Sequence, residues 1–145
     1  MPSVFDVAAY ILRQQGSMTA MKLQKLVYYS QAWSLAWDDD RMFPEEIQAW
    51  ANGPVVPALF REHQGKFRVN GDTFPNGGPH VLTEVQESTC DAVLAFYGDK
   101  SPQWLSDLTH MESPWQDARS GLPAEARSGA VISLESMAEY YSSLR

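Results

Sequence analysis

The sequence predicts a mainly α-helical protein, in which a compact single-domain bundle of helices surrounds a buried central helix, with a small β-hairpin or extended segment. Residues 19–37 are apolar on nearly every face at helical spacing, which is typical of a helix inside a domain. The chain has 145 residues, 44% of them hydrophobic, which is enough for one core without metal or disulfide bonds. We therefore expect a single domain over residues 1–145.

Three further helices are expected to enclose the central one, over residues 3–15, 84–97 and 133–144. Each begins at a hydroxyl side chain that can cap it, and each carries an apolar stripe. Shorter helices are predicted over 57–63 and 101–110, because a proline stands at the first helical position of each. The stripe expected to be buried on the helix over 84–97 consists of Val85, Thr89, Ala92, Val93 and Phe96.

The central helix is expected to begin after Thr19 as its N-cap. Lys22 and Lys25 lie one turn apart and share an edge with Tyr29, so we interpret this edge as solvated and as a candidate contact surface for a partner. The acidic run at 38–40 that follows the helix lacks the Gly and Glu that a calcium-binding EF-hand loop would need.

Between the helices, the sequence predicts short extended segments. Residues 42–50 alternate like a strand and lead into a turn at Gly53-Pro54. In the Gly-rich region 65–79, Asn70-Gly71 predicts a hairpin with a type I′ turn, and the spacing of a phosphate-binding loop is missing. We expect this region to be a surface loop that a short linker can replace without loss of stability. Its candidate partner-binding residues are Lys66, Phe67, Arg68 and Phe74.

No pattern of an active site or a metal site stands out. Cys90 falls in the middle of a predicted helix and is interpreted as a small buried thiol, not as a nucleophile. His110-Met111-Glu112 matches the H-x-E of zinc deaminases, but the P-C-x-x-C that completes such a site is missing. One Cys and three scattered His give no metal-ligand spacing. We expect no catalytic residue, no cofactor and no metal.

The formal net charge of −7 opposes attraction to nucleic-acid phosphates and favours a basic protein partner. The apolar stretches are too short and too charged to cross a membrane. No charged-then-apolar leader precedes Phe5, and the single cysteine fits a reducing compartment. We expect a cytoplasmic protein whose partner is neither a membrane nor a nucleic acid.

Several motifs then follow one another in a specific order. The phrase MKLQKLVYY at 21–29 precedes Ala49-Trp50, GPVVP at 53–57, Tyr97-Gly98, LSDLTH at 105–110 and Pro114-Trp115. In this order they resemble the Panacea domain of SocA-like and GepA-like phage-associated bacterial proteins, over nearly the whole chain. Ala51-Asn52 before Gly53 and the Gly-rich insert at 65–79 depart from the family pattern, so the identity of the partner does not carry over.

The resemblance implies an antitoxin that neutralises a cognate toxin by direct protein contact. The SocA type also acts as an adaptor that delivers its toxin to a AAA+ protease. The family motif brings no catalytic residue with it. Its residues are expected to be structural, and most of them to lie in the core: Leu23, Leu26, Tyr28, Trp50, Gly53, Pro54, His110 and Trp115.

Two alternatives from other classes stay open at this point. An enzyme acting through His110 would need a pocket that converges on this residue, with titratable neighbours. A DNA-binding autoregulator would need a helix-turn-helix with a basic recognition helix, which the sequence does not show.

Overall fold

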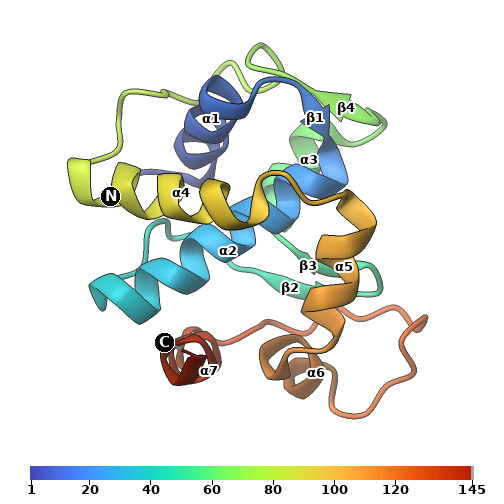
Figure 1. The fold of residues 1–145 in the computed structure, drawn as a ribbon. Coiled ribbons are helices and arrows are strands. Elements are labelled where there is room, and N and C mark those ends of the chain that lie inside the picture. The colour runs from blue at the N-terminus through green and yellow to red at the C-terminus, as the bar shows by residue number, and fades with distance from the viewer. Residues whose placement is uncertain (145) are drawn as a thin grey trace.

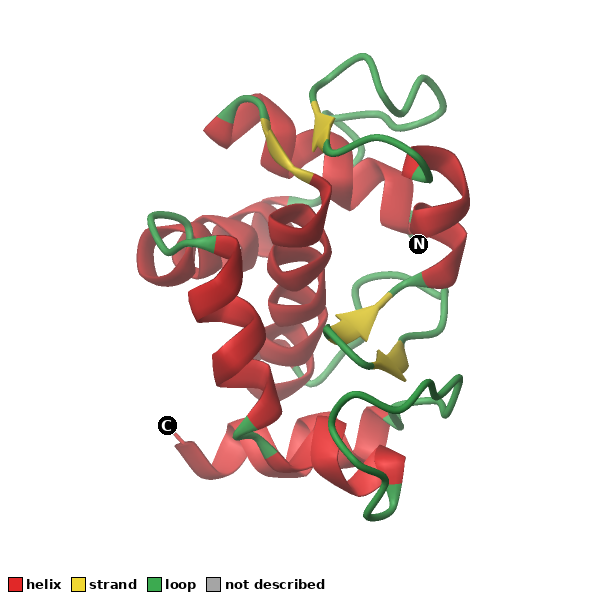
Figure 2. Ribbon diagram, turned by 90° about the vertical axis from the view of Figure 1, so that its right-hand side faces the viewer, coloured by secondary structure: helices red, strands yellow, loops and turns green. Residues whose placement is uncertain are grey.

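The computed structural model describes residues 1–144, and in this part of the chain seven helices and two small sheets form one mainly α-helical fold (Figures 1 and 2). The predicted fold class is confirmed. The elements in chain order are α1 (Val4–Gln15), β1 (Met18–Thr19), α2 (Ala20–Asp38), β2 (Gln48–Trp50), β3 (Gly53–Val55), α3 (Pro57–His63), β4 (Arg68–Val69), α4 (Glu84–Tyr97), α5 (Pro102–His110), α6 (Ser113–Arg119) and α7 (Leu134–Leu144).

The predicted central helix is α2, which runs through the middle of the molecule with α1, α4, α5 and α7 packed around it (Figure 1). Thr19 caps it, as expected, by accepting a hydrogen bond from the Lys22 backbone N–H at 3.1 Å. It is buried along nearly its whole length. Trp37, however, is 42% exposed, beside the start of α4.

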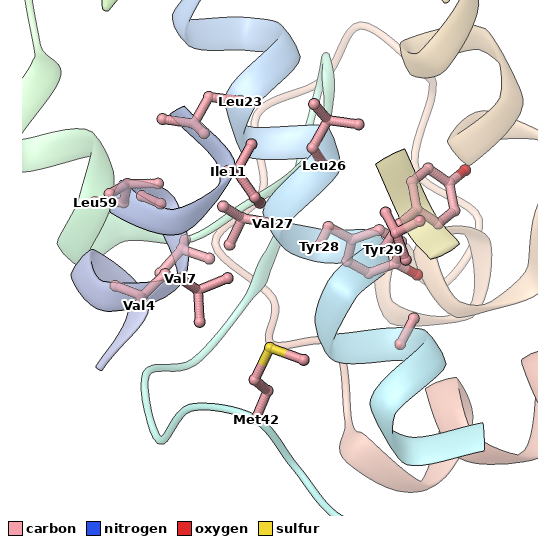
Figure 3. Close-up of a cluster of buried hydrophobic side chains, with 14 of the residues drawn as sticks. Val4, Val7, Ile11, Leu23, Leu26, Val27, Tyr28, Tyr29, Met42 and Leu59 are labelled. Atoms are coloured by element: carbon pink, nitrogen blue, oxygen red, sulfur yellow. The ribbon is translucent and has the colours of Figure 1, made fainter. Parts of the chain in front are cut away.

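The core is continuous around the first half of α2. Val4, Val7 and Ile11 of α1 face Val27 of α2, with Leu59 of α3 beside them (Figure 3). A helix that contacts apolar neighbours on several sides needs apolar residues all round, which explains the pattern seen in the sequence.

The predicted caps of the flanking helices are confirmed. Ser3 and Asp6 form a capping box at α1, and Thr83 and Gln86 form another at α4. The buried stripe of α4 was assigned wrongly in part: Thr89 and Val93 are buried as expected, together with Cys90 and Tyr97, but the other three residues face solvent. The reason is that α4 carries two adjacent apolar stripes, and only one of them meets the core. The stripe that stays outside is Val85, Ala92 and Phe96.

The two sheets differ from the prediction in position. Strands β2 and β3 form the expected extended segment, paired antiparallel, but the turn lies at Ala51-Asn52 and Gly53 already belongs to β3. The hairpin predicted around Asn70-Gly71 is wrong. Arg68–Val69 pairs instead with Met18–Thr19, because the chain after residue 70 turns away and buries Phe74 beside Phe5.

Candidate functional site

A pocket of about 1030 Å³ opens beside the first turns of α2. Four segments line it: the start of α2, the β2–β3 hairpin, the end of α3 with the loop that follows, and residues 127–129. The larger side chains of the lining include Gln24, Lys25, Trp50, Asn52, Phe60, His63, Gln64, Lys66, Phe67 and Arg127. The pocket therefore combines residues that lie far apart in the sequence.

Lys25 lies at the base of this pocket and is completely buried. Its Nζ donates a hydrogen bond to the Pro54 carbonyl oxygen at 3.2 Å, and no carboxylate pairs with it among residues 1–144. Burial without a counter-ion lowers the pKa of Lys25 to about 7. The Cε atom of Lys25 also occupies the space that a Cβ at Gly53 would need, at 2.6 Å, so Gly53 has no room for a side chain.

Gln24 connects α2 to the next wall of the pocket. Its Oε1 accepts from the Val56 backbone N–H at 2.9 Å, and its Nε2 donates to the Val56 carbonyl and to Nε2 of His63 at 3.0 Å. An imidazole nitrogen that accepts a hydrogen bond is unprotonated, which agrees with the lowered pKa that burial gives His63. These bonds hold α2 against both ends of α3, since Val56 is its N-cap and His63 its last residue.

The pocket lining carries charge of one sign. Lys25, Lys66 and Arg127 are cationic side chains, His63 adds an imidazole, and no Asp or Glu belongs to the lining. Lys66 and Arg127 are exposed, and neither forms an ion pair within the described residues. A basic pocket is unexpected in a chain with a net charge of −7.

The residues predicted to contact a partner are not all at the surface. Lys66 and Phe67 are exposed at the mouth of the pocket, and Arg68 is exposed beside them with its Nη2 donating to the Ser17 carbonyl. Phe74 is buried in the core, so its expected place in an exposed loop is wrong. Its ring lies 6.4 Å from that of His63.

The solvated edge predicted for α2 is also wrong. Lys22 is partly exposed, but Lys25 and Tyr29 are fully buried. Polar groups on this edge are buried because the hairpin and the later helices supply their hydrogen-bond partners. The one sign of this burial in the sequence is that the other faces of the helix are apolar.

Tyr29 belongs to a buried polar cluster that sequence reasoning missed. The hydroxyls of Tyr29 and Tyr141 both donate to Oε1 of Glu112 at 2.7 Å, and the Tyr28 hydroxyl lies 3.0 Å from that of Tyr141. Burial raises the pKa of Glu112, although the two hydroxyl donors oppose the shift. No local spacing relates these residues, so only the folded chain brings them together. The cluster joins α2 and α7 to the segment between α5 and α6.

Arg119 was missed for the same reason. It is buried, its Nη1 donates to the Ala49 carbonyl at 2.8 Å, and its Nη2 donates to three carbonyls of residues 123–126. Its guanidinium lies 4.7 Å from the centroid of the Trp115 ring, whose Nε1 donates to the Trp50 carbonyl. Arg119 and Trp115 thus fix strand β2 and the loop that leads to Arg127.

Most of the residues of the family motif are buried in the core. Leu23, Leu26, Tyr28, Gly53, Pro54 and Trp115 are buried, as expected, whereas Trp50 is partly exposed. Trp50 lies in the wall of the pocket, edge-on to Phe60 at 5.0 Å between ring centroids.

A family model described as antitoxin SocA-like, Panacea domain, matches residues 23–116, which is more than half of the chain. The chain belongs to this family. Neither a search of curated proteins nor a search of solved structures gave a match. The Panacea segment contains Lys25, the β2–β3 hairpin and Glu112, but it leaves out α1 and α7, which pack against it.

His110, another residue of the Panacea segment, is not part of the pocket lining. Its ring stacks on Trp115 at 4.1 Å, and its Nε2 is buried without a hydrogen-bond partner among residues 1–144. Burial lowers the pKa of His110, and a backbone hydrogen bond to Ala51 opposes this shift. Residues 1–144 contain no cluster of three or more His, Cys, Asp or Glu side chains that could hold a metal ion. None of the helices in this range has the length and apolar character needed to cross a membrane.

A second surface of this Panacea protein lies on α4. Val85 is 59% exposed and Phe96 is 61% exposed, with Ala92 between them on the same face. Trp37 borders a shallow hollow that it shares with Val85. Glu84 and Asp91 each stand next in sequence to a residue of this stripe, on the same side of it and about 100° around the helix. We call the apolar stripe, its acidic border and Trp37 the outer face of α4.

Proposed function

We propose that this protein is an antitoxin that neutralises a cognate toxin by direct protein contact. Membership of the SocA-like Panacea family carries the proposal. The encounter would take place in the cytoplasm, as the single cysteine suggested.

The outer face of α4 supports the proposal as the main contact surface. Large apolar side chains exposed together mark interaction sites when polar residues border them. Phe96 and Trp37 are exposed aromatic residues, a type enriched in protein interfaces. The acidic border would guide a basic toxin to this face and speed association.

A second contact is proposed for Lys66, Phe67 and Arg68, which remain exposed as the sequence predicted. Together they offer one aromatic ring and two cations on a loop that follows α3. They lie outside the apolar stripe of α4, so each surface can be altered without the other.

Co-expression with the protein encoded next to this chain tests the proposal. The wild-type chain is expected to restore growth and to co-purify with the toxin without nucleotide or metal. The double variant Val85→Ser, Phe96→Ser is expected to weaken the complex by about tenfold or more, as loss of interface anchors does. Val131→Ser with Met111→Ser is the matched control, because both residues are exposed and apolar but lie elsewhere.

All of these variants change exposed side chains, so their melting temperatures are expected to stay close to that of the wild type. Rescue without a physical complex would contradict direct contact. Equal loss of binding in the control would show that α4 is not the contact surface. The rate of association is expected to fall as salt rises, since exposed charges are screened beyond about 8 Å at physiological ionic strength.

We infer a structural role, not a catalytic one, for His110. Its ring supports Trp115 beneath the hairpin, and it lines neither of the two pockets described above. An enzymatic antitoxin would be recognised by rescue that His110→Ala abolishes although the variant stays folded.

Delivery of the toxin to a AAA+ protease is proposed as a second step of neutralisation. Toxin levels followed after synthesis is stopped, with and without this chain, test that step. Regulation of its own promoter is disfavoured by the net charge of −7. A sequence-specific gel shift by this chain alone would reverse that judgement.

A further inference from the structure

We propose that the pocket beside α2 binds a mononucleotide, with the phosphate at Lys66 and Arg127 and the base against Trp50 and Phe67. This ligand site does not depend on the toxin contact proposed at α4, although it shares Lys66 and Phe67 with the second contact proposed above.

The distribution of charge gives the first argument. The whole chain is acidic, yet the pocket lining has cations at its mouth and at its base, and no carboxylate. Like charges repel with a strength set by their separation, and a bound anion offsets that repulsion. Arginine and lysine side chains are the usual partners of phosphate groups.

Lys25 gives the second argument. A buried ammonium group with three donors and one carbonyl partner is poorly compensated. The groups that face it from neighbouring elements do not supply an anion: His63 on α3 and His110 on α5 are histidines whose pKa burial lowers, and Thr109 is neutral. An anion in the pocket above Lys25 would stabilise its charged form.

Aromatic rings and side-chain amides in the pocket lining favour a nucleotide over a simple anion. Trp50 is partly exposed in the wall, and Phe67 is 79% exposed at the mouth, so a flat base has aromatic faces to stack on. The side-chain amides of Asn52 and Gln64 line the pocket and make no hydrogen bond within residues 1–144. Carboxamides carry both donors and acceptors, as recognition of base edges requires.

Other anionic partners fit less well. A long nucleic acid would meet the repulsion of an acidic protein. An extended acidic peptide would need a free strand edge, but β2 is paired with β3 on one side and with residues 130–131 on the other. The volume of about 1030 Å³ lies near the upper end of small-ligand pockets, which leaves room for a base, a ribose and phosphate.

Calorimetry on the full chain is the test, with AMP, GMP, CMP and UMP as probes beside inorganic phosphate, the free nucleosides and an acidic peptide. At least one mononucleotide is expected to bind more tightly than phosphate or its own nucleoside. Lys66→Ser with Arg127→Ser is expected to weaken it by about tenfold or more, and Phe67→Ser by a few-fold. Lys100→Ser with Arg41→Ser is the matched control and is expected to bind normally, since neither residue lines the pocket.

Dependence on pH gives a second, independent readout. Nucleotide binding is expected to add a proton to Lys25, whose pKa is about 7 in the free protein, so affinity should fall as pH rises from 7 to 8.5. Burial holds the pKa of His63 below its ordinary value, so His63 does not titrate in this window. Lys25→Met is expected to remove most of this dependence. The phosphate's own titration is the same for both proteins and cancels in the comparison.

The proposal is overturned if no mononucleotide binds at millimolar concentration, or if phosphate alone binds as tightly as any nucleotide. Binding of the acidic peptide alone would assign the pocket to a protein segment and overturn it as well. Unchanged affinity in the Lys66, Arg127 variant would place the nucleotide elsewhere. Since the toxin assay uses α4 variants, failure here leaves the antitoxin proposal standing, and the reverse also holds.

Discussion

The pocket beside α2 and the outer face of α4 differ in both construction and charge. Separate segments, from residue 19 to residue 129, form the pocket, and buried hydrogen bonds hold them together. The face on α4 comes from one helix, with Trp37 at its edge. The pocket is cationic and the face is acidic. The net charge of −7 therefore does not describe the local charge of either surface, and the two surfaces suit different partners.

The difference in construction predicts how the two surfaces respond to mutation. Changes in the supports of the pocket should lower the stability of the whole domain, because those supports are part of the core. Changes on the face should alter binding alone. The following variants test this contrast, from the largest expected effect to the smallest.

Replacing residues 66–74 with a Gly/Ser linker is expected to cost the most. The segment contains Val69 and Phe74, which are both buried, so the free energy of unfolding should fall by roughly 4 kcal/mol or more. This reverses the sequence-based expectation that the loop is replaceable. Urea titration measures the change, and Lys66→Ser with Phe67→Ser, which leaves the buried residues in place, should lie within about 0.5 kcal/mol of the wild type. Equal stability of the linker variant would mean that Phe74 does not support the core.

Trp115→Ala should lower the free energy of unfolding by about 3–5 kcal/mol. The ring is buried, carries His110 on one side, and donates to the Trp50 carbonyl at 2.8 Å. Trp104→Ala is the control, because this ring is partly exposed, and its effect should be much smaller. Similar losses at both positions would remove the contrast between buried support and surface.

Gly53→Ala should cost on the order of 1–3 kcal/mol. The backbone φ of +115° is strained for any residue with a Cβ, and that Cβ would lie 2.6 Å from Cε of Lys25 and 2.8 Å from Oγ1 of Thr109. Gly71→Ala serves as the control, since a Cβ there meets nothing within 4 Å. Thermal melts of the two variants compare the positions directly, and an unaffected Gly53→Ala would show that the hairpin can shift.

The smallest effect concerns pH. Lys25 has a pKa of about 7 when folded, against an ordinary value of 10.5, so the unfolded chain binds more protons between these values. Stability should therefore rise with pH, by roughly 1–2 kcal/mol between pH 7 and 8.5. The destabilisation is complete below pH 7 and is relieved as pH increases. Lys25→Met should show a flatter profile in denaturant titrations, and matching slopes would mean that Lys25 keeps its charge in the fold.

The sequence predicted what local chemistry decides. Caps at Ser3, Thr19 and Thr83, and the proline that opens α3, placed the helices within a residue or two. The family motifs led to the right family. Local rules were sufficient because each depends on neighbours a few residues away.

The candidate sites were harder to predict because they depend on distant contacts. Lys25 and Tyr29 have the spacing of a solvated edge, and only the hairpin and Glu112 make burial acceptable. On α4, two adjacent stripes are equally apolar, and no local signal says which one meets the core. The pocket was not predicted at all, since Arg127 and Lys25 lie about a hundred residues apart in a chain of 145.

The last helix has a consequence for how the protein is made. Tyr141 on α7 supplies one of the two hydroxyls that bond Glu112, and α7 covers α2 opposite the first helix. Proteins are synthesised from the N-terminus, so the central helix leaves the ribosome long before its final cover does. Until residue 141 emerges, a carboxyl group and several tyrosine rings stay open to water and to proteases. A chain interrupted in this last stretch would hold every residue that the family model matches and still be unable to close its core.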